Sequence, residues 1–253
     1  MRESLPLSLP SFDPGHVWLC GAGPGDAGLL TLHALNALEQ ADVIVHDALI
    51  GADILGLARD GAALIYAGKR GGQSATQADI SQQLVTLARQ GKRVLRLKGG
   101  DPFMFGRGGE ESELLNAADI PFRIIPGISA GIGGLACAGI SVTHRDINQT
   151  VVFATGHDPA TDWDAISRAA PVIVIYMGLK RIDTIAEKLI KAGRAATQPM
   201  AIVTDASLPT QKVLETTLGD VGKDLAAHAM SAPAIICIGD TVPLRHIMGD
   251  QNG

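Results

Sequence analysis

The stretch RVLRLKGGDPFMFGRGGEE, residues 93–111, decides the fold class of this 253-residue chain. It begins with a largely apolar run over 93–97 that predicts a strand, and it continues through a glycine-rich loop. It ends in Glu110 and Glu111, acidic residues that are favourable in the first turn of a helix because they face the positive end of its dipole. A strand, a loop and a helix in this order form the repeating unit of an α/β protein.

The same alternation continues on both sides of this stretch. The first half predicts strands and helices in turn: strands at 17–20, 43–45, 64–66 and 122–125, and helices after Asp26, over 77–89 and over 110–117. The second half predicts a similar series: strands at 151–154, 172–176, 200–203, 213–216 and 234–238, and helices at 163–168, 180–191 and 220–227. We therefore expect two α/β domains with mainly parallel or mixed sheets, over residues 16–126 and 127–253, and a ligand cleft between them.

Two further segments affect the domain organisation. Residues 1–15 contain three prolines and lack the apolar run of a signal peptide, so they predict a flexible N-terminal tail. Residues 124–144 carry no charge, but their glycines and Pro126 make them a poor membrane span. We expect a buried helix with small faces there, and no membrane association.

Composition and charge narrow the functional class. Hydrophobic residues make up 46% of the chain, which suits a packed core, and the net charge of −5 argues against a nucleic-acid-binding surface. Cys20, Cys137 and Cys237 are far apart and have no Cys/His cluster around them. This spacing predicts neither a disulfide framework nor a metal site, and it favours a cytoplasmic protein.

GAGPGD at 21–26 nearly matches the dinucleotide-binding fingerprint, with Asp47 about twenty residues further on. The match fails at Asp26, a carboxylate where a pyrophosphate would lie, and at Pro24, which lacks an N–H. A nicotinamide-dependent dehydrogenase is therefore disfavoured. A tight turn capped by Asp26 explains the motif equally well.

The loop over residues 98–111 is the strongest candidate for a ligand site. Gly99 and Gly100 allow a ligand to approach the backbone closely, and Asp101 could accept hydrogen bonds from an amine or a ribose. The alternative is a long connection that binds no ligand. Its length and glycine content favour the site.

Taken together, eight motifs resemble those of the uroporphyrinogen-III C-methyltransferases in the tetrapyrrole methylase family. They are GAGPGD at 21–26, VHD at 45–47, GKR at 68–70, RLKGGDPFMFGRGGEE at 96–111, PGISA at 126–130, THRD at 143–146, TGH at 155–157 and YMG at 176–178. The resemblance extends from about residue 17 to residue 244. It implies a homodimer in which two α/β domains hold S-adenosylmethionine, with S-adenosylhomocysteine as its product.

The resemblance also implies a set of cofactor-binding positions. These are Pro24, Gly99, Gly100, Asp101, Met104, Ser129, Ala130, Met177 and Ala206. Ser129 stands where the family usually has threonine and keeps the hydroxyl. Ala206 stands where the family usually has glycine, which makes this contact the least secure of the set.

The implied reaction is methylation of uroporphyrinogen III at C2 and C7, which gives precorrin-2. Asp47 and Lys69 match the family's proposed proton acceptor and donor. Without the resemblance, we would interpret them as a loop carboxylate and a surface cation.

The substrate carries eight carboxylates, so arginines are expected to bind it. Arg70, Arg107 and Arg145 are the candidates, and the last two also count among the expected catalytic residues. Glu110 either positions Arg107 or contacts a pyrrole N–H.

Two alternatives stay open. One is a related methylase acting on a later corrin precursor, and the other is a non-catalytic tetrapyrrole-binding module. Gln73 and Ile147 depart from residues common in the family, histidine and tyrosine, which affects fine substrate contacts only. Whether the product leads to sirohaem, cobalamin or haem d1 does not follow from this sequence.

Overall fold

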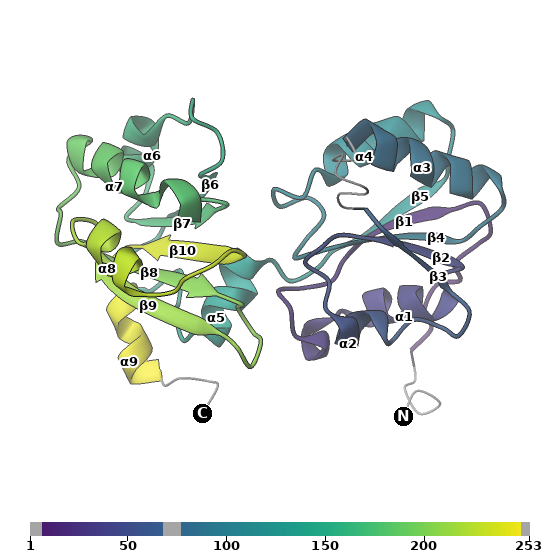
Figure 1. Cartoon of the computed structure of the whole chain (residues 1–253), viewed down its shortest axis with the longest axis horizontal. Coiled ribbons are helices and arrows are strands. Elements are labelled where there is room, and N and C mark those ends of the chain that lie inside the picture. The colour runs from purple at the N-terminus through teal and green to yellow at the C-terminus, as the bar shows by residue number, and fades with distance from the viewer. Residues whose placement is uncertain (1–6, 68–76, 249–253) are drawn as a thin grey trace. The chain divides into compact units, whose positions relative to one another are not determined.

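The computed structural model describes residues 7–67 and 77–248 and divides into two compact units, Met1–Ile128 and Ser129–Gly253 (Figure 1). Each unit contains one five-stranded sheet covered by helices. The predicted fold class, α/β with mainly parallel or mixed sheets, is confirmed: one sheet is parallel and the other is mixed.

The first unit is built on a parallel sheet. Its strands are β1 (Val17–Gly21), β2 (Val43–His46), β3 (Ala63–Tyr66), β4 (Val94–Lys98) and β5 (Phe122–Ile125), in the order β3-β2-β4-β1-β5. Its helices are η1 (Ala27–Leu29), α1 (Leu32–Gln40), α2 (Ala52–Leu55), α3 (Gln77–Arg89) and α4 (Gly108–Ala117). Helices α1 and α2 lie on one face of the sheet, and α3 and α4 on the other (Figure 1).

Alternation along each strand explains why both faces are covered. Trp18 and Cys20 pack with the buried side chains of α1, whereas Val17 and Leu19 pack with those of α3. Successive side chains of a strand point to opposite faces, so a strand that is apolar throughout needs helices on both sides.

The second unit is built on a mixed sheet. Its strands are β6 (Val151–Thr155), β7 (Val172–Tyr176), β8 (Pro199–Thr204), β9 (Lys212–Thr217) and β10 (Ala234–Ile238), in the order β6-β7-β10-β8-β9. Only β6 and β7 pair in parallel.

The helices of the second unit also cover both faces of their sheet. In chain order they are η2 (Ala130–Gly134), α5 (Leu135–Cys137), α6 (Trp163–Ala169), η3 (Leu179–Arg181), α7 (Ile182–Lys191), α8 (Val221–Ala227), η4 (Val242–Leu244) and α9 (Arg245–Met248). Helices α6, α7 and α8 pack on one face, and α5 and η4 on the other. Within the described part of the chain, no helix has the length and apolarity needed to cross a membrane.

The helix expected after Asp26 begins later than predicted. The Asp26 carboxylate accepts a hydrogen bond from Gly28 N at 2.7 Å and caps only the short η1. Helix α1 begins at Leu32, and its N-cap is Thr31, whose hydroxyl accepts from Ala34 N. The GAGPGD turn therefore leads into a single 3-10 turn and not into a long helix.

Two other expectations are wrong in part. Residues 124–144 do not form one buried helix, because only 130–137 are helical and Ile132 is 53% exposed. The expected tail is not loose up to residue 15, because Phe12 is 2% exposed and stacks on Trp18 at 4.1 Å between ring centroids. Two hydrogen bonds tie this segment to α1: Phe12 N donates to Gln40 Oε1, and Asn36 Nδ2 donates to the carbonyl oxygen of Pro10.

Four glycines bring the ends of β1, β4 and β5 into backbone contact. Gly23 and Gly100 exchange two backbone hydrogen bonds, of 3.2 and 2.7 Å. A Cβ on Gly21 would lie 2.4 Å from Gly100 O, and one on Gly127 would lie 2.1 Å from the same atom. Any side chain at these two positions would push the loops apart.

We expect Gly127→Ala to lower the free energy of unfolding by about 2–3 kcal/mol, because its methyl group would overlap backbone atoms. Gly109→Ala is the matched control, since its Cβ would meet nothing within 4 Å on helix α4. That control should gain about 0.5–1 kcal/mol from helix propensity. Urea titration of both variants measures the difference, and equal stability of the two would contradict the backbone contact.

Candidate functional site

The predicted site residues of the first unit gather at one edge of its sheet. Parallel strands end at the same edge, so the segments that follow β1, β2, β4 and β5 lie beside one another there. Pro24, Asp47 and the loop over 99–104 all belong to these segments. The structure thus brings together residues that are far apart in the sequence.

Asp47 follows β2, and its carboxylate is held by a buried arginine. Arg96 Nη2 donates to Asp47 Oδ1 at 2.5 Å, and Lys98 Nζ lies 4.0 Å from Asp47 Oδ2. The Asp47 side chain is 32% exposed. Asp47 is thus an anchored carboxylate that a molecule at this edge could reach, and it caps no nearby backbone N–H in the described chain.

Behind Asp47 lies a buried cluster of charges that the sequence analysis missed. Arg96 Nε donates to Glu111 Oε1 at 3.0 Å, and Lys98 Nζ donates to the same oxygen at 3.2 Å. Arg96, Lys98 and Glu111 are 2%, 3% and 0% exposed. Burial lowers the pKa of Lys98, and the neighbouring Arg96 lowers it further. Charged residues at alternate positions of an otherwise apolar strand were the signal that could have revealed this cluster.

The glycine-rich loop is fastened by its own aspartate. Asp101 Oδ1 accepts from Phe103 N at 2.8 Å, and Asp101 Oδ2 accepts from Gly127 N at 3.0 Å. The backbone N–H and C=O of Gly100 are both bonded to Gly23. Within this loop, Gly99 is therefore the glycine placed to offer its backbone to a ligand, while Gly100 and Asp101 hold the loop's shape.

Arg107 and Glu110 form an exposed pair at the start of α4. Arg107 Nε donates to Glu110 Oε1 at 3.1 Å, and the two side chains are 58% and 55% exposed. The pKa of the Glu110 carboxyl is lowered. The larger cause is a hydrogen bond from the backbone N–H of Glu110 itself, and the hydrogen bond from Arg107 adds to it. Of the two roles expected for Glu110, the structure shows the contact with Arg107.

In the second unit, two predicted residues also follow strand ends at a common edge. Tyr176 of β7 pairs with Ile235, and Thr204 of β8 pairs with Ala234, so both strands end beside the start of β10. Met177 comes directly after β7, and Ala206 comes two residues after the end of β8. The Met177 side chain is 54% exposed, whereas Ala206 is buried.

Ser129 and Ala130 are fixed to the same edge by a tyrosine. Tyr176 Oη lies 2.6 Å from Ser129 Oγ and accepts from Gly131 N at 2.9 Å. A Cβ on Gly131 would lie 2.2 Å from that oxygen, so glycine is required there. Tyr176 is a site-building residue that sequence reasoning did not identify.

Backbone strain coincides with the predicted site. Among the described residues, six other than glycine have positive φ angles: Phe105, Arg107, Asp119, Met177, Asp205 and Ser207. All but Asp119 lie in or beside the predicted segments. Such conformations cost of order 1–3 kcal/mol each and cluster at functional sites.

The structure places one further predicted residue, Arg145, between α5 and β6 of the second unit. Arg145 is exposed in a loop whose shape depends on the buried Asn148, which accepts from His144 N and donates to Val142 O and Thr150 O. Lys69 and Arg70 lie outside the described residues.

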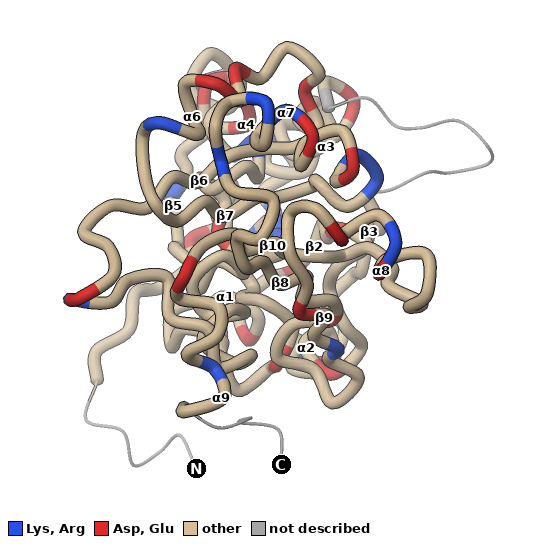
Figure 2. Tube along the Cα trace, turned by 90° about the vertical axis from the view of Figure 1, so that its left-hand side faces the viewer, with Lys and Arg blue, Asp and Glu red and all other residues tan. Residues whose placement is uncertain are grey.

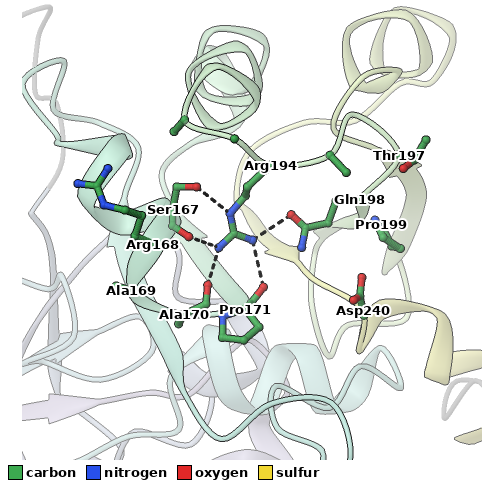
Figure 3. A pocket seen from close by; sticks show the side chains of 13 residues that line it. Ser167, Arg168, Ala169, Ala170, Pro171, Arg194, Thr197, Gln198, Pro199 and Asp240 are labelled. Carbon is green, nitrogen blue, oxygen red and sulfur yellow. Dashed lines mark hydrogen bonds between the residues drawn. The ribbon is translucent and has the colours of Figure 1, made fainter.

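A hollow in the second unit contains none of the predicted residues. It has a volume of about 600 Å³ and is centred on Arg194 (Figure 3). The guanidinium donates to the backbone oxygens of Ser167, Ala170 and Pro171 and to the side chains of Ser167 and Gln198. Its donors are thus used in joining the end of α6 to the start of β8, which gives it a structural role.

Lys and Arg residues are interspersed with Asp and Glu residues along the trace of the described residues (Figure 2). The described residues contain no group of three His, Cys, Asp or Glu side chains that could hold a metal ion.

Comparisons with known proteins agree on one family. The family described as "Tetrapyrrole (Corrin/Porphyrin) Methylases" matches residues 16–222. A uroporphyrinogen-III C-methyltransferase from Sinorhizobium sp is 57% identical, over 97% of this chain and 90% of the relative. The siroheme synthase of Pseudomonas fluorescens (strain SBW25) is 49% identical over 93% of this chain, which spans 52% of that longer relative.

A solved structure leads to the same family. The uroporphyrin-III C-methyl transferase from Thermus thermophilus, complexed with S-adenyl homocysteine, is 33% identical to this chain. It aligns with a TM-score of 0.80 over 90% of this chain and 99% of its own.

Asp101→Ala should make the amides of Phe103 and Gly127 exchange with solvent about tenfold faster, because each loses a charge-assisted hydrogen bond. Asp101→Asn retains one acceptor oxygen and should protect one of the two amides. Hydrogen-exchange NMR measures both variants. Unchanged exchange in Asp101→Ala would show that other contacts hold the loop.

Proposed function

The chain belongs to the tetrapyrrole methylase family, and from this premise we propose that it methylates uroporphyrinogen III at C2 and C7. The products are precorrin-2 and two molecules of S-adenosylhomocysteine. One observation carries the proposal most directly. The carboxylate of Asp47 is anchored at the carboxyl edge of the parallel sheet, yet it stays 32% exposed.

The residues at both strand edges suit S-adenosylmethionine. An adenosyl group with an amino-acid tail needs apolar surface and backbone or hydroxyl hydrogen bonds. The exposed apolar side chain of Met177, the backbone of Gly99 and the hydroxyl of Ser129 supply groups of these kinds. We propose that Pro24, Gly100, Asp101, Met104, Ala130 and Ala206 complete the cofactor set, partly by holding the loops in shape. When bound, S-adenosylmethionine supplies an electrophilic methyl group on its sulfonium.

Asp47 is the proposed proton acceptor. The methylated macrocycle must lose a proton, and a positioned carboxylate can accept it. Oδ1 is engaged by Arg96, while Oδ2 accepts no hydrogen bond from a described residue. We therefore assign the proton to Oδ2. Lys69 is kept as the proposed proton donor.

Arginines are proposed to bind the substrate carboxylates. Arg107 pairs with Glu110 in an exposed setting, where ion pairs contribute little, so a carboxylate of the substrate can compete for the guanidinium. Arg145 is exposed in its loop, and Arg70 completes the proposed set.

The wider biological setting is proposed from the resemblance and the composition. We propose a cytoplasmic homodimer whose product feeds sirohaem, cobalamin or haem d1 formation. The siroheme synthase relative supports the link to sirohaem, and the cysteine spacing supports a cytoplasmic protein.

Incubating the protein anaerobically with uroporphyrinogen III and S-adenosylmethionine should give a doubly methylated product and S-adenosylhomocysteine, both measured by mass spectrometry. Asp47→Asn should slow product formation by roughly 10²–10⁴-fold, because the proton acceptor is lost. Asp53→Asn, an exposed carboxylate on α2, is the control and should behave like the wild type.

The alternatives predict different outcomes of this assay. If the protein methylates a later corrin precursor and not uroporphyrinogen III, the related methylase is the correct alternative. Binding of the macrocycle without any S-adenosylhomocysteine would indicate a non-catalytic module.

Arg107→Ala should raise the KM for uroporphyrinogen III about tenfold, through loss of a charge-assisted contact with a substrate carboxylate. Its affinity for S-adenosylhomocysteine, measured by calorimetry, should not change. Arg168→Ala is the matched control, because Arg168 also forms an exposed ion pair, with Asp164 on α6. Equal loss of substrate and cofactor binding in Arg107→Ala would contradict the assignment of Arg107 to the substrate site.

A further inference from the structure

We propose that Arg96 is a positioning residue, which acts by holding the Asp47 carboxylate, and that the buried Glu111 is the counter-charge that makes this possible. The catalytic part of this inference rests on the proposed function. The geometric part rests on the buried charge cluster, which we define as Arg96, Lys98, Asp47 and Glu111.

Arg96 lies where one guanidinium can reach two carboxylates. It is on β4, the central strand of the parallel sheet, and is 2% exposed. Its Nη2 donates to Asp47 and its Nε donates to Glu111, while Nη1 lies 3.4 Å from the carbonyl oxygens of Val45 and Leu97. The planar fork therefore joins the segment after β2 to helix α4 through the interior of the unit.

Lysine could not replace arginine in this role. An ammonium group is a point charge on a flexible stem, whereas the guanidinium presents its donors in a rigid fork. Lys98 illustrates the difference, because its Nζ hydrogen-bonds Glu111 but stays 4.0 Å from Asp47 Oδ2. The direction in which the Asp47 carboxylate is held thus depends on Arg96.

Glu111 balances the charge of the cluster. Two cations and two carboxylates make it neutral, and three of the four side chains are almost fully buried. A buried charge without a partner is strongly unfavourable, so removing Glu111 alone leaves two cations facing one carboxylate. Removing Arg96 and Glu111 together leaves Lys98 opposite Asp47, which is again neutral.

This charge balance separates positioning from stability. We expect Arg96→Met and Glu111→Met each to lower the Tm, and the double variant Arg96→Met/Glu111→Met to recover most of that loss. The kcat of the double variant should nevertheless stay roughly 10²-fold below the wild type, because Asp47 is no longer held in place. Arg96→Lys keeps the charge without the fork and should show reduced kcat with a smaller change in Tm.

A double-mutant cycle tests whether Arg96 acts through Asp47. In the Asp47→Asn background, Arg96→Lys should change the single-turnover rate of S-adenosylhomocysteine formation by less than about twofold. Recovery of kcat together with Tm in Arg96→Met/Glu111→Met would overturn the proposal. So would an undiminished effect of Arg96→Lys in the Asp47→Asn background.

A measurement without substrate keeps the two proposals distinguishable. The side-chain carboxyl ¹³C resonance of Asp47, assigned with Asp47→Asn, should shift or broaden in Arg96→Lys. An unchanged resonance would overturn the positioning role even if the wild type is fully active. A shifted resonance in a protein that yields no methylated product would support the geometry and reject the proposed function.

Discussion

Direct backbone contact among Gly21, Gly100 and Gly127 is the constraint on which the first unit's site depends. These glycines stand at or just beyond the ends of β1, β4 and β5, and the contact has no room for a single Cβ on Gly21 or Gly127. Close packing fixes the path of the loop over 99–104. The carboxylate of Asp101 then joins this loop to the segment after β5 by accepting a hydrogen bond from Gly127 N. The backbone at this edge therefore has no room for a side chain at Gly21 or Gly127.

The buried charge cluster adds chemistry to this backbone frame. A parallel sheet covered on both faces normally carries apolar strands, so Arg96 and Lys98 in β4 are costly residues. Glu111 and Asp47 offset that cost, and only Asp47 is partly exposed. The net charge of −5 excludes a broad basic surface, but it does not describe such local arrangements.

In the second unit, a tyrosine holds predicted residues at one edge of the sheet. Its mixed sheet places the ends of β7 and β8 on either side of the start of β10, and Tyr176 fixes Ser129 and Gly131 at that edge. Strained backbone at Met177, Asp205 and Ser207 marks the same edge. Local strain of this kind persists only where the surrounding packing maintains it.

The sequence by itself determined the strands, several of the helices and the family. Strands β5, β7 and β10 and helix α3 occupy the residues predicted for them, because apolar periodicity and turn residues act over short distances along the chain. The motifs around Asp47, Gly99 and Met177 were equally visible, since they are local. Tertiary structure alone decided which charges meet. Arg96 is 49 residues from Asp47 and 15 from Glu111, and only the pairing of β2 with β4 and the packing of α4 bring these three together. It likewise decided that Phe12 is buried against Trp18, because contacts between distant segments leave no periodic signal in the sequence.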